Sequence, residues 1–361
     1  MDESSFISKN FKPKKGRIVC ESPSNIALIK YWGKYGLQFP INPSLSFTLS
    51  NCKTKTSLEY SPRLEGQGRF DFLYDGKIKK TFENKIEEFF ERISPFCPYL
   101  ENLFLKINSK NTFPHSSGIA SSASAFCSLA FCIVSIEKRY SERMTEQFFF
   151  NKVSFIARLG SGSGSRSVSG PLMIWGENEF HSGSSNYFAV NYRYKIHQIF
   201  KNYQNTVLII DDRIKILSSS DGHKKMTKHP FINDRKNQAK NNLKIILDAI
   251  SMGDLQVFIK VVEEEAMTLH SLMMSSQPPT VLIKSKTLEV IELLKNFREK
   301  ENVPICFTLD AGPNVHLLYP EKYKQEVMRF IKKKLVYYCQ NHLFINDNVG
   351  LGTKLLDFKL I

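Results

Sequence analysis

The hydrophobic and polar positions predict a chain in which strands and helices follow one another along most of its length. Residues 17–60 favour β structure, because short apolar runs are separated there by turn residues at 40–43. A β-hairpin is expected over residues 69–82, where Asp75 and Gly76 interrupt an alternating pattern. The other elements expected in the first half are helices over 84–93, 120–140 and 145–159, and strands over 103–108 and 170–176.

A polar, tyrosine-rich stretch over residues 178–205 marks the expected boundary between two domains. A new strand starts at 206, and the long polar segment 211–235 is unlike a core element. The elements expected beyond it are helices over 236–250, 254–272, 281–300 and 321–343, and strands over 304–309 and 315–319. The Gly-x-Gly near the C-terminus is interpreted as an ordinary turn. The sequence thus divides into a flexible tail (1–16), an N-terminal domain (17–195) and a C-terminal domain (206–361).

Length and composition indicate a soluble, globular enzyme. The 361 residues are 42% hydrophobic, which suffices for a large core and excludes a disordered protein. The first residues mix charges of both signs and lack the apolar centre of a signal peptide. The most apolar stretch, 125–136, is too short to cross a membrane. Seven scattered cysteines without a CxxC pair suit reduced thiols, so we expect a cytoplasmic protein without a membrane partner.

The net charge of +15 leaves three interpretations open, namely lysines spread over solvated faces, attraction of anionic small substrates, and nucleic-acid binding. The basic residues are dispersed and are not interleaved with aromatic residues in a stripe. The longest basic run, 332–334, lies on an expected helix. We therefore favour solvated faces, place anionic substrates second and expect no nucleic-acid partner.

Residues 114–124, PHSSGIASSAS, predict a phosphate site at the start of a buried helix. Gly118 allows a close approach of the chain, and Ser121 and Ser122 offer hydroxyl groups. The first N–H groups of a helix lack backbone acceptors and attract anions. Taken alone, the motif fits an ordinary serine N-cap better than a ligand site.

Residues 22–36, SPSNIALIKYWGKYG, place polar tips on an apolar strand. The candidates for ligand contact in this stretch are Asn25, Lys30, Tyr31, Trp32 and Lys34. From the residues alone, Lys30 and Lys34 are more simply explained as surface lysines.

Two further stretches carry candidate chemistry. Residues 157–167, ARLGSGSGSRS, fit either a flexible Gly/Ser linker or a loop that offers N–H groups, hydroxyls and the Arg166 guanidinium to a polyanion. Residues 308–314, TLDAGPN, project Asp310 from the end of a strand. An Asx-turn is the commoner role of an aspartate in such a place.

Taken together and in this order, the four motifs resemble diphosphomevalonate decarboxylases of the GHMP small-molecule kinase superfamily, over roughly residues 17–320. The resemblance implies an α+β fold of two lobes: an N-terminal β/α domain like that of ribosomal proteins and a C-terminal ferredoxin-like α/β sandwich domain. It implies ATP-dependent decarboxylation of (R)-5-diphosphomevalonate to isopentenyl diphosphate, ADP, phosphate and CO2 in the mevalonate pathway. A homodimer is typical of the family.

The resemblance also implies a role for each candidate residue. Asp310 would orient the C3 hydroxyl of the substrate and accept its proton, with Lys30 beside it. Arg166, assisted by Ser163, would bind the C1 carboxylate. The other substrate-binding candidates are Asn25, Tyr31, Trp32, Lys34, Ser161 and Gly162. The candidates for contact with ATP are Gly118, Ser121, Ser122 and, more weakly, Ser219, and Ser122 is also the candidate for contact with Mg2+.

The chain departs from the usual family pattern at a few positions. Leu159 stands where the family commonly has Gln, and Gly164 and Ser165 stand where it commonly has Ala and Cys. An insertion is expected around residues 138–147. The alternatives that stay open are a sister enzyme on the same fold, such as a mevalonate 3-kinase or a phosphomevalonate decarboxylase, and a basic nucleic-acid-binding protein.

Two clusters of titratable residues are interpreted as solvated. His223 and His229 have no carboxylate or cysteine near them in the sequence, so a solvated loop is favoured over a metal site. Glu263, Glu264 and Glu265 are consecutive on an expected helix and diverge around its axis, so a solvated face is favoured over a carboxylate site.

Overall fold

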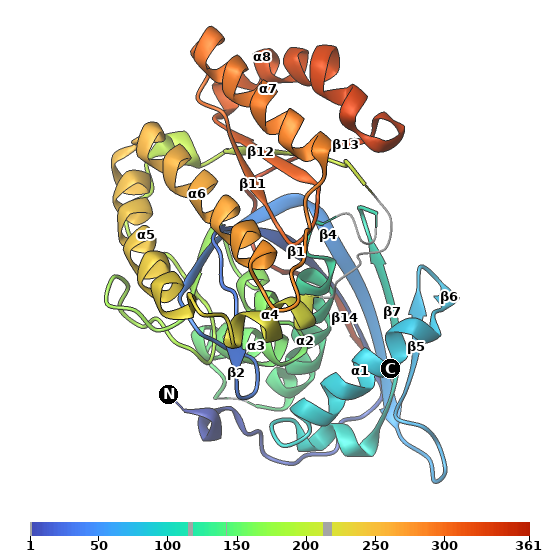
Figure 1. Ribbon diagram of the computed structural model, residues 1–361. Coiled ribbons are helices and arrows are strands. Elements are labelled where there is room, and N and C mark those ends of the chain that lie inside the picture. The colour runs from blue at the N-terminus through green and yellow to red at the C-terminus, as the bar shows by residue number, and fades with distance from the viewer. Residues whose placement is uncertain (1, 115–117, 142, 212–218) are drawn as a thin grey trace.

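Two separate sheets, each covered by helices, organise the chain (Figure 1). The computed structural model describes residues 2–114, 118–141, 143–211 and 219–361. The mixed α+β architecture agrees with the two-domain fold expected from the resemblance.

The N-terminal domain is built on two long paired strands. β1 (Gly16–Ile29) and β4 (Ser44–Pro62) are antiparallel, and the sheet runs in the order β14-β1-β4-β7-β5-β6. Its other strands are β5 (Phe70–Tyr74), β6 (Lys77–Ile78), β7 (Leu103–Asn111), β8 (Leu172–Trp175), β9 (Val190–Asn191) and β14 (Lys354–Leu360). The expected hairpin is confirmed, since β5 pairs with β6 and both Asp75 and Gly76 adopt the left-handed backbone that a tight hairpin turn needs.

Three helices cover this sheet: α1 (Lys80–Ile93), α2 (Ser121–Tyr140) and α3 (Glu146–Gly160). Apolar residues at helical spacing in α1 face the core, and Thr145 caps α3 by accepting the N–H of Phe148. In the described part of the chain, α2 is the one helix long and apolar enough to cross a membrane, and 72% of that window is buried inside the protein. Because α2 packs against β1, β4 and α3, its apolar character serves the core.

The C-terminal domain has a four-stranded antiparallel sheet in the order β11-β12-β10-β13. Its strands are β10 (Gln204–Leu208), β11 (Cys306–Leu309), β12 (Val315–Tyr319) and β13 (Phe344–Asn348). Its helices are α4 (Ser219–Thr227), α5 (Ile232–Met252), α6 (Leu255–Met274), α7 (Ser285–Glu301) and α8 (Lys324–Phe330). β11 and β12 are neighbours, and β10, the first strand of this domain, lies between β12 and β13. This is the strand order of the ferredoxin-like fold.

The remaining elements are short. They are a β-ribbon of β2 (Lys34–Tyr35) and β3 (Phe39–Pro40), a π-helical turn over Ile331–Leu335, and 3-10 turns over Glu3–Phe6, Pro98–Asn102, Gly162–Ser167, Gln198–Phe200, Glu321–Tyr323, Val336–Tyr338 and Gln340–His342. The single helix expected over 321–343 is therefore wrong, because the segment is divided among α8 and several tighter or wider turns.

Both ends of the chain differ from the sequence-based expectation. Phe6 is fully buried and stacks on Phe155 with ring centroids 4.3 Å apart, so the described part of the expected tail, residues 2–16, is anchored to the N-terminal domain and is not loose. The C-terminal residues 354–360 form β14, which pairs with β1 along the edge of the N-terminal sheet. Residues 354–360 therefore belong to the N-terminal sheet and not to the C-terminal domain expected over 206–361; β14 covers the backbone groups that would otherwise leave β1 as an open edge.

Candidate active site

Lys30 and Asp310 meet where two strands of different domains end. Lys30 follows β1 and Asp310 follows β11, and Lys30 Nζ lies 3.0 Å from Asp310 Oδ1. The Lys30 side chain is 3% exposed and that of Asp310 is 25% exposed. Burial lowers the pKa of Lys30, and the nearby Asp310 carboxylate opposes that shift. The pair therefore joins a buried cation to a carboxylate that a ligand can reach.

Arg166 lies in the same charged neighbourhood and is held by two hydroxyls. Its Nε donates to Ser46 Oγ at 2.6 Å and its Nη1 donates to Ser44 Oγ at 2.7 Å. The guanidinium carbon lies 5.1 Å from the centre of the Tyr31 ring. Burial lowers the pKa of Arg166 to about 10, while Tyr31 and Asp310 act in the opposite direction. Because two nitrogens of the planar guanidinium are bound, the third, Nη2, has a fixed direction before any ligand binds.

The loop 160–167 is ordered by contacts with β1. Asn25 Nδ2 donates to the carbonyl oxygen of Ser163 at 3.0 Å and to Ser167 Oγ at 2.9 Å. Residues Gly162–Ser167 form a 3-10 turn, so the flexible-linker interpretation is wrong. A Cβ placed on Gly162 would lie 2.5 Å from the hydroxyl oxygen of Tyr31. Glycine thus lets the loop reach the Tyr31 hydroxyl, whose pKa burial raises to about 12.

The start of α2 lies against the same loop. Ser122 Oγ is 3.3 Å from Ser161 Oγ, which is in turn 3.2 Å from Ser163 Oγ. The N-cap residue of α2 is Ala120, which makes no side-chain cap hydrogen bond, so the ordinary serine N-cap is excluded. The N–H of Ala123 in the first turn donates to the carbonyl oxygen of Ala120 at 2.8 Å, and the N–H groups before it lie where a helix attracts anions. Gly118 has a φ of +82° and lies next to the side chain of Asn314, whereas the part of the motif at 115–117 lies outside the described residues.

Lys34 and Trp32 occupy different surroundings. Lys34 is half-buried on β2, and burial together with the charge of Arg92 lowers its pKa to about 8. Trp32 is buried in an apolar cluster with Met226 and Leu269. Its ring therefore packs against α4 and α6, while the last ATP candidate, Ser219, is the first residue of α4.

Three histidines were missed or misinterpreted in the sequence. His223 is buried, stacks on Tyr31 with centroids 4.7 Å apart, and its Nδ1 accepts the N–H of Gly33 at 3.0 Å. His229 is also buried, so the solvated-loop prediction is wrong for both residues. His270, which no motif indicated, lies with Nε2 3.2 Å from the carbonyl oxygen of Asp310. Burial lowers the pKa of His223 well below its usual range and that of His270 to about 4.

The predicted solvated face of glutamates on α6 is also wrong. Glu265 is fully buried and forms an ion pair with Arg235 of α5, with Nη2 and Oε2 2.6 Å apart. Glu263 pairs with Arg298, and Glu264 accepts the side-chain amide N–H of Gln238. The three carboxylates do diverge around the helix, as expected, but each finds a partner on another element. A local helical pattern carries no signal for such partners.

Comparisons with known proteins agree along nearly the whole chain. The sequence model of the diphosphomevalonate decarboxylase-like N-terminal domain matches residues 22–187, and that of the mevalonate 5-diphosphate decarboxylase C-terminal domain matches residues 206–351. The diphosphomevalonate decarboxylase of Debaryomyces hansenii is 29% identical, over 93% of this chain and 86% of that protein. That of Ganoderma lucidum is 28% identical, over 91% of this chain and 84% of that protein.

Solved structures give the same result. The mevalonate diphosphate decarboxylase of Staphylococcus aureus has a TM-score of 0.81 at 26% identity, covering 95% of this chain and 98% of that one. The enzyme of Enterococcus faecalis has a TM-score of 0.79 at 26% identity, covering 95% and 99%. A further structure, described as MDDEF in complex with MVAPP, AMPPCP and magnesium, has a TM-score of 0.81 at 26% identity, covering 95% and 99%.

Proposed function

The chain belongs to the diphosphomevalonate decarboxylase family, and from this premise we propose how its own side chains carry out the reaction. The function is the ATP-dependent decarboxylation of (R)-5-diphosphomevalonate to isopentenyl diphosphate, ADP, phosphate and CO2, a step of the mevalonate pathway. The observation that carries the mechanism is the contact between Lys30 and Asp310 at the junction of the two domains.

Asp310 orients the C3 hydroxyl of the substrate and accepts its proton. A tertiary alcohol is crowded and weakly acidic, so it needs a carboxylate within hydrogen-bond reach as it attacks phosphorus. The 25% exposure of the Asp310 side chain gives the hydroxyl access to it. The buried ammonium of Lys30 stabilises the ionised carboxylate and the negative charge of the phosphoryl group in transfer.

Arg166 binds the C1 carboxylate, and Ser163 assists it. Once the C3 oxygen carries a phosphoryl group, the C3–O bond breaks and phosphate leaves with the bonding electron pair. The bond between C2 and the carboxylate carbon then supplies the electrons of the new double bond, and CO2 is released. Because Ser44 and Ser46 fix two nitrogens of the Arg166 guanidinium, the carboxylate is held in one orientation relative to C3.

The diphosphate of the substrate lies against Tyr31, Lys34, Ser161 and Gly162 in this proposal. Lys34 supplies a positive charge, and the loop beyond Ser161 supplies hydroxyl and N–H groups. Asn25 acts by holding the loop through the Ser163 carbonyl oxygen. Trp32, also a candidate for substrate contact, packs against Met226 and Leu269 next to this region.

In this proposal ATP lies with its phosphates at the start of α2, near Gly118, Ser121 and Ser122, and Ser219 at the start of α4 is a further contact. The start of a helix favours phosphates through its N–H groups and its dipole. The structure described with AMPPCP and magnesium supports ATP and Mg2+ as the partners of this chain.

The donor set around Ser122 fits Mg2+ in one particular way. Among the described residues, no three His, Cys, Asp or Glu side chains gather to hold a metal ion. The Ser122 hydroxyl would hold Mg2+ together with phosphate oxygens and water, a set of oxygen ligands that suits this ion. When bound, the ion neutralises part of the phosphate charge.

The turnover assay tests this function and separates it from its relatives. Purified protein with ATP, Mg2+ and (R)-5-diphosphomevalonate is expected to release CO2 and ADP in equal amounts, with far lower turnover on the monophosphate. ADP without CO2 would indicate a 3-kinase, and preference for the monophosphate would indicate a phosphomevalonate decarboxylase. We further propose a cytoplasmic homodimer without nucleic-acid or membrane partners; sedimentation of the purified protein tests the dimer.

A further inference from the structure

The backbone of Lys30 is held from outside its own domain. Its N–H donates to Glu265 Oε2 at 2.8 Å, and its carbonyl oxygen accepts from Arg235 Nη2 at 2.7 Å. Asn42 Nδ2 donates to the same carbonyl oxygen at 3.0 Å. Both backbone polar groups of this one residue are therefore bound, and two of the three contacts come from a single ion pair.

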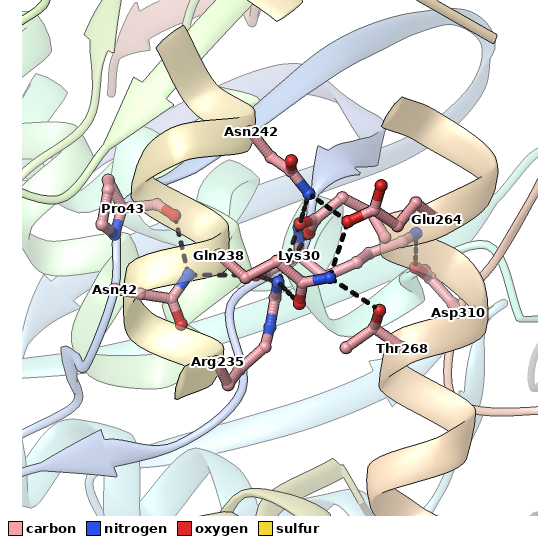
Figure 2. A network of polar contacts seen from close by, with 10 residues as sticks. Lys30, Asn42, Pro43, Arg235, Gln238, Asn242, Glu264, Thr268 and Asp310 are labelled. Atoms are coloured by element: carbon pink, nitrogen blue, oxygen red, sulfur yellow. Dashed lines mark hydrogen bonds and ion pairs between the residues drawn. The ribbon is translucent and has the colours of Figure 1, made fainter. Parts of the chain in front are cut away.

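That ion pair is buried, and its members also bind Gln238 and Asn242, which belong to the same network of polar contacts (Figure 2). Arg235 and Glu265 have side-chain exposures of 1% and 0%, and both guanidinium Nη atoms contact the carboxylate, at 2.7 and 2.6 Å. Asn242 Nδ2 donates to Glu265 Oε1 at 2.9 Å. Burying two charges costs about as much free energy as their attraction returns, so such a pair gives weak support to stability alone.

We propose that the Arg235–Glu265 ion pair is a positioning device for Lys30, which fixes the Lys30 peptide and thereby the path along which its ammonium reaches Asp310. The inference rests on the role proposed for Lys30 and Asp310 above. Arg235 on α5, Glu265 on α6 and Asp310 after β11 all belong to the C-terminal domain. The pair thus holds the end of β1 on the same domain that carries the carboxylate.

The Glu265 carboxylate also helps to keep Lys30 positively charged. Burial lowers the pKa of Lys30, and Glu265 is one of the two anions that raise it. The charged and titratable groups that face Lys30 are Asp310, Glu265, Arg166, Arg235 and His270. Removing the charge of Glu265 therefore lowers the pKa of Lys30 further and moves the loss of its positive charge to lower pH.

A second buried ion pair provides a matched control. Lys152 and Glu137 lie 2.7 Å apart with side-chain exposures of 1% and 8%, between α3 and α2 of the N-terminal domain. Glu137→Gln and Glu265→Gln remove the same charge from the same kind of buried pair. Only the second carboxylate binds the backbone of Lys30.

The experiment compares these two variants in the full-length protein with ATP, Mg2+ and (R)-5-diphosphomevalonate. Both variants are expected to lower the thermal midpoint. Glu265→Gln is expected to lower kcat per folded enzyme by about a hundredfold, because small displacements of a reacting group have effects of that size. It also moves the alkaline limb of kcat to lower pH, whereas Glu137→Gln keeps the wild-type kcat and pH profile.

A double variant keeps the inference testable if Glu265→Gln does not fold. Arg235→Met with Glu265→Gln removes both charges and leaves no unpaired buried ion, a replacement that buried pairs tolerate. Reduced kcat per folded enzyme in either variant, with the Glu137→Gln control unaffected, supports the inference. Wild-type kcat and an unmoved alkaline limb overturn it. An inactive wild type would instead contradict the proposed function.

Discussion

The hydroxyl oxygens of Ser122 and Ser161 lie 3.3 Å apart although 39 residues separate them in the chain. Ser122 belongs to the first turn of α2, and Ser161 caps the end of α3 before the 3-10 turn. The sequence offered these segments as two separate candidate anion-binding motifs. Their contact supports the proposal that the ATP phosphates and the substrate bind side by side, as transfer of a phosphoryl group between them requires.

Replacing Asp310 by Asn is expected to remove the proton acceptor of the reaction. General bases contribute about 10²- to 10⁴-fold to rate, so kcat is expected to fall by that factor. The affinity for an ATP analogue is expected to stay near the wild-type value, because the proposed nucleotide site lies at the start of α2. Steady-state kinetics together with calorimetry of the analogue measure both quantities; turnover that survives the substitution would remove Asp310 from its assigned role.

Arg166→Lys tests whether the guanidinium shape is needed as well as its charge. A lysine ammonium lacks the planar fork with which Arg166 binds Ser46 and Ser44 through two nitrogens and keeps Nη2 for a carboxylate. Because a hydrogen bond to a charged group contributes about 1.5–3 kcal/mol, kcat/KM is expected to fall by roughly one to two powers of ten. Arg298→Lys is the control, since Arg298 pairs with Glu263 away from the site. Equal kinetics of Arg166→Lys and wild type would argue against the carboxylate contact.

The order of the elements and most of the site motifs could be predicted because their signals are local. Turn residues at 75–76 specified the hairpin, and small residues with helical spacing specified α2. The partners of Glu265 could not be predicted in this way. Arg235 is 30 residues away from it and Lys30 is 235 residues away, and both contacts exist only because α5, α6 and β1 pack together.

His223 and β14 were missed for the same physical reason. The sequence around His223 is polar and predicts a solvated loop. The ring is nevertheless buried, because it stacks on Tyr31 and its Nδ1 accepts the N–H of Gly33, 190 residues earlier in the chain. β14 has exposed leucines at 355, 356 and 360 that do not alternate with polar residues, so the segment lacks the period-two pattern of a strand. Its place is set by the free edge of β1, which no pattern within 354–360 can reveal.

Gly162→Ala tests the close approach of the loop to Tyr31. An added Cβ would meet the Tyr31 hydroxyl oxygen at 2.5 Å and the Trp175 ring at 2.9 Å. Overpacking of this kind costs about 1–3 kcal/mol, so both the thermal midpoint and the affinity for diphosphomevalonate are expected to fall. Gly68→Ala is the control, because nothing lies within 4 Å of its added Cβ. If Gly162→Ala has the same thermal midpoint and the same affinity for diphosphomevalonate as Gly68→Ala, the loop can accept a Cβ at this position and the argument from close approach is wrong.

The depressed pKa of Lys34, about 8, predicts a pH dependence of substrate binding. Above that pH the side chain is neutral in the free enzyme and no longer attracts the diphosphate, so kcat/KM for diphosphomevalonate is expected to fall at alkaline pH. Arg92→Gln removes the positive charge that helps to lower this pKa, and it is expected to move the fall to higher pH. Profiles of kcat/KM from pH 7 to 9.5 measure both effects. If Arg92→Gln does not move the alkaline fall of kcat/KM, Lys34 is excluded as its origin.

His270 is expected to make the fold less stable in acid. Its pKa is about 4 in the folded protein because it is buried beside Lys30, whereas an unfolded chain protonates its histidines near pH 6.5. Between these two values the unfolded state binds the extra proton, so the free energy of unfolding decreases as the pH falls. At pH 5 this single group accounts for about 2 kcal/mol of lost stability.

His270→Gln cannot take up the proton, and its free energy of unfolding should therefore fall less than that of the wild type between pH 7 and pH 5. Denaturant titrations at both values measure the difference, with His342→Gln at an exposed position as the control. If His270→Gln and His342→Gln lose the same stability over that interval, the buried neutral state assigned to His270 is wrong.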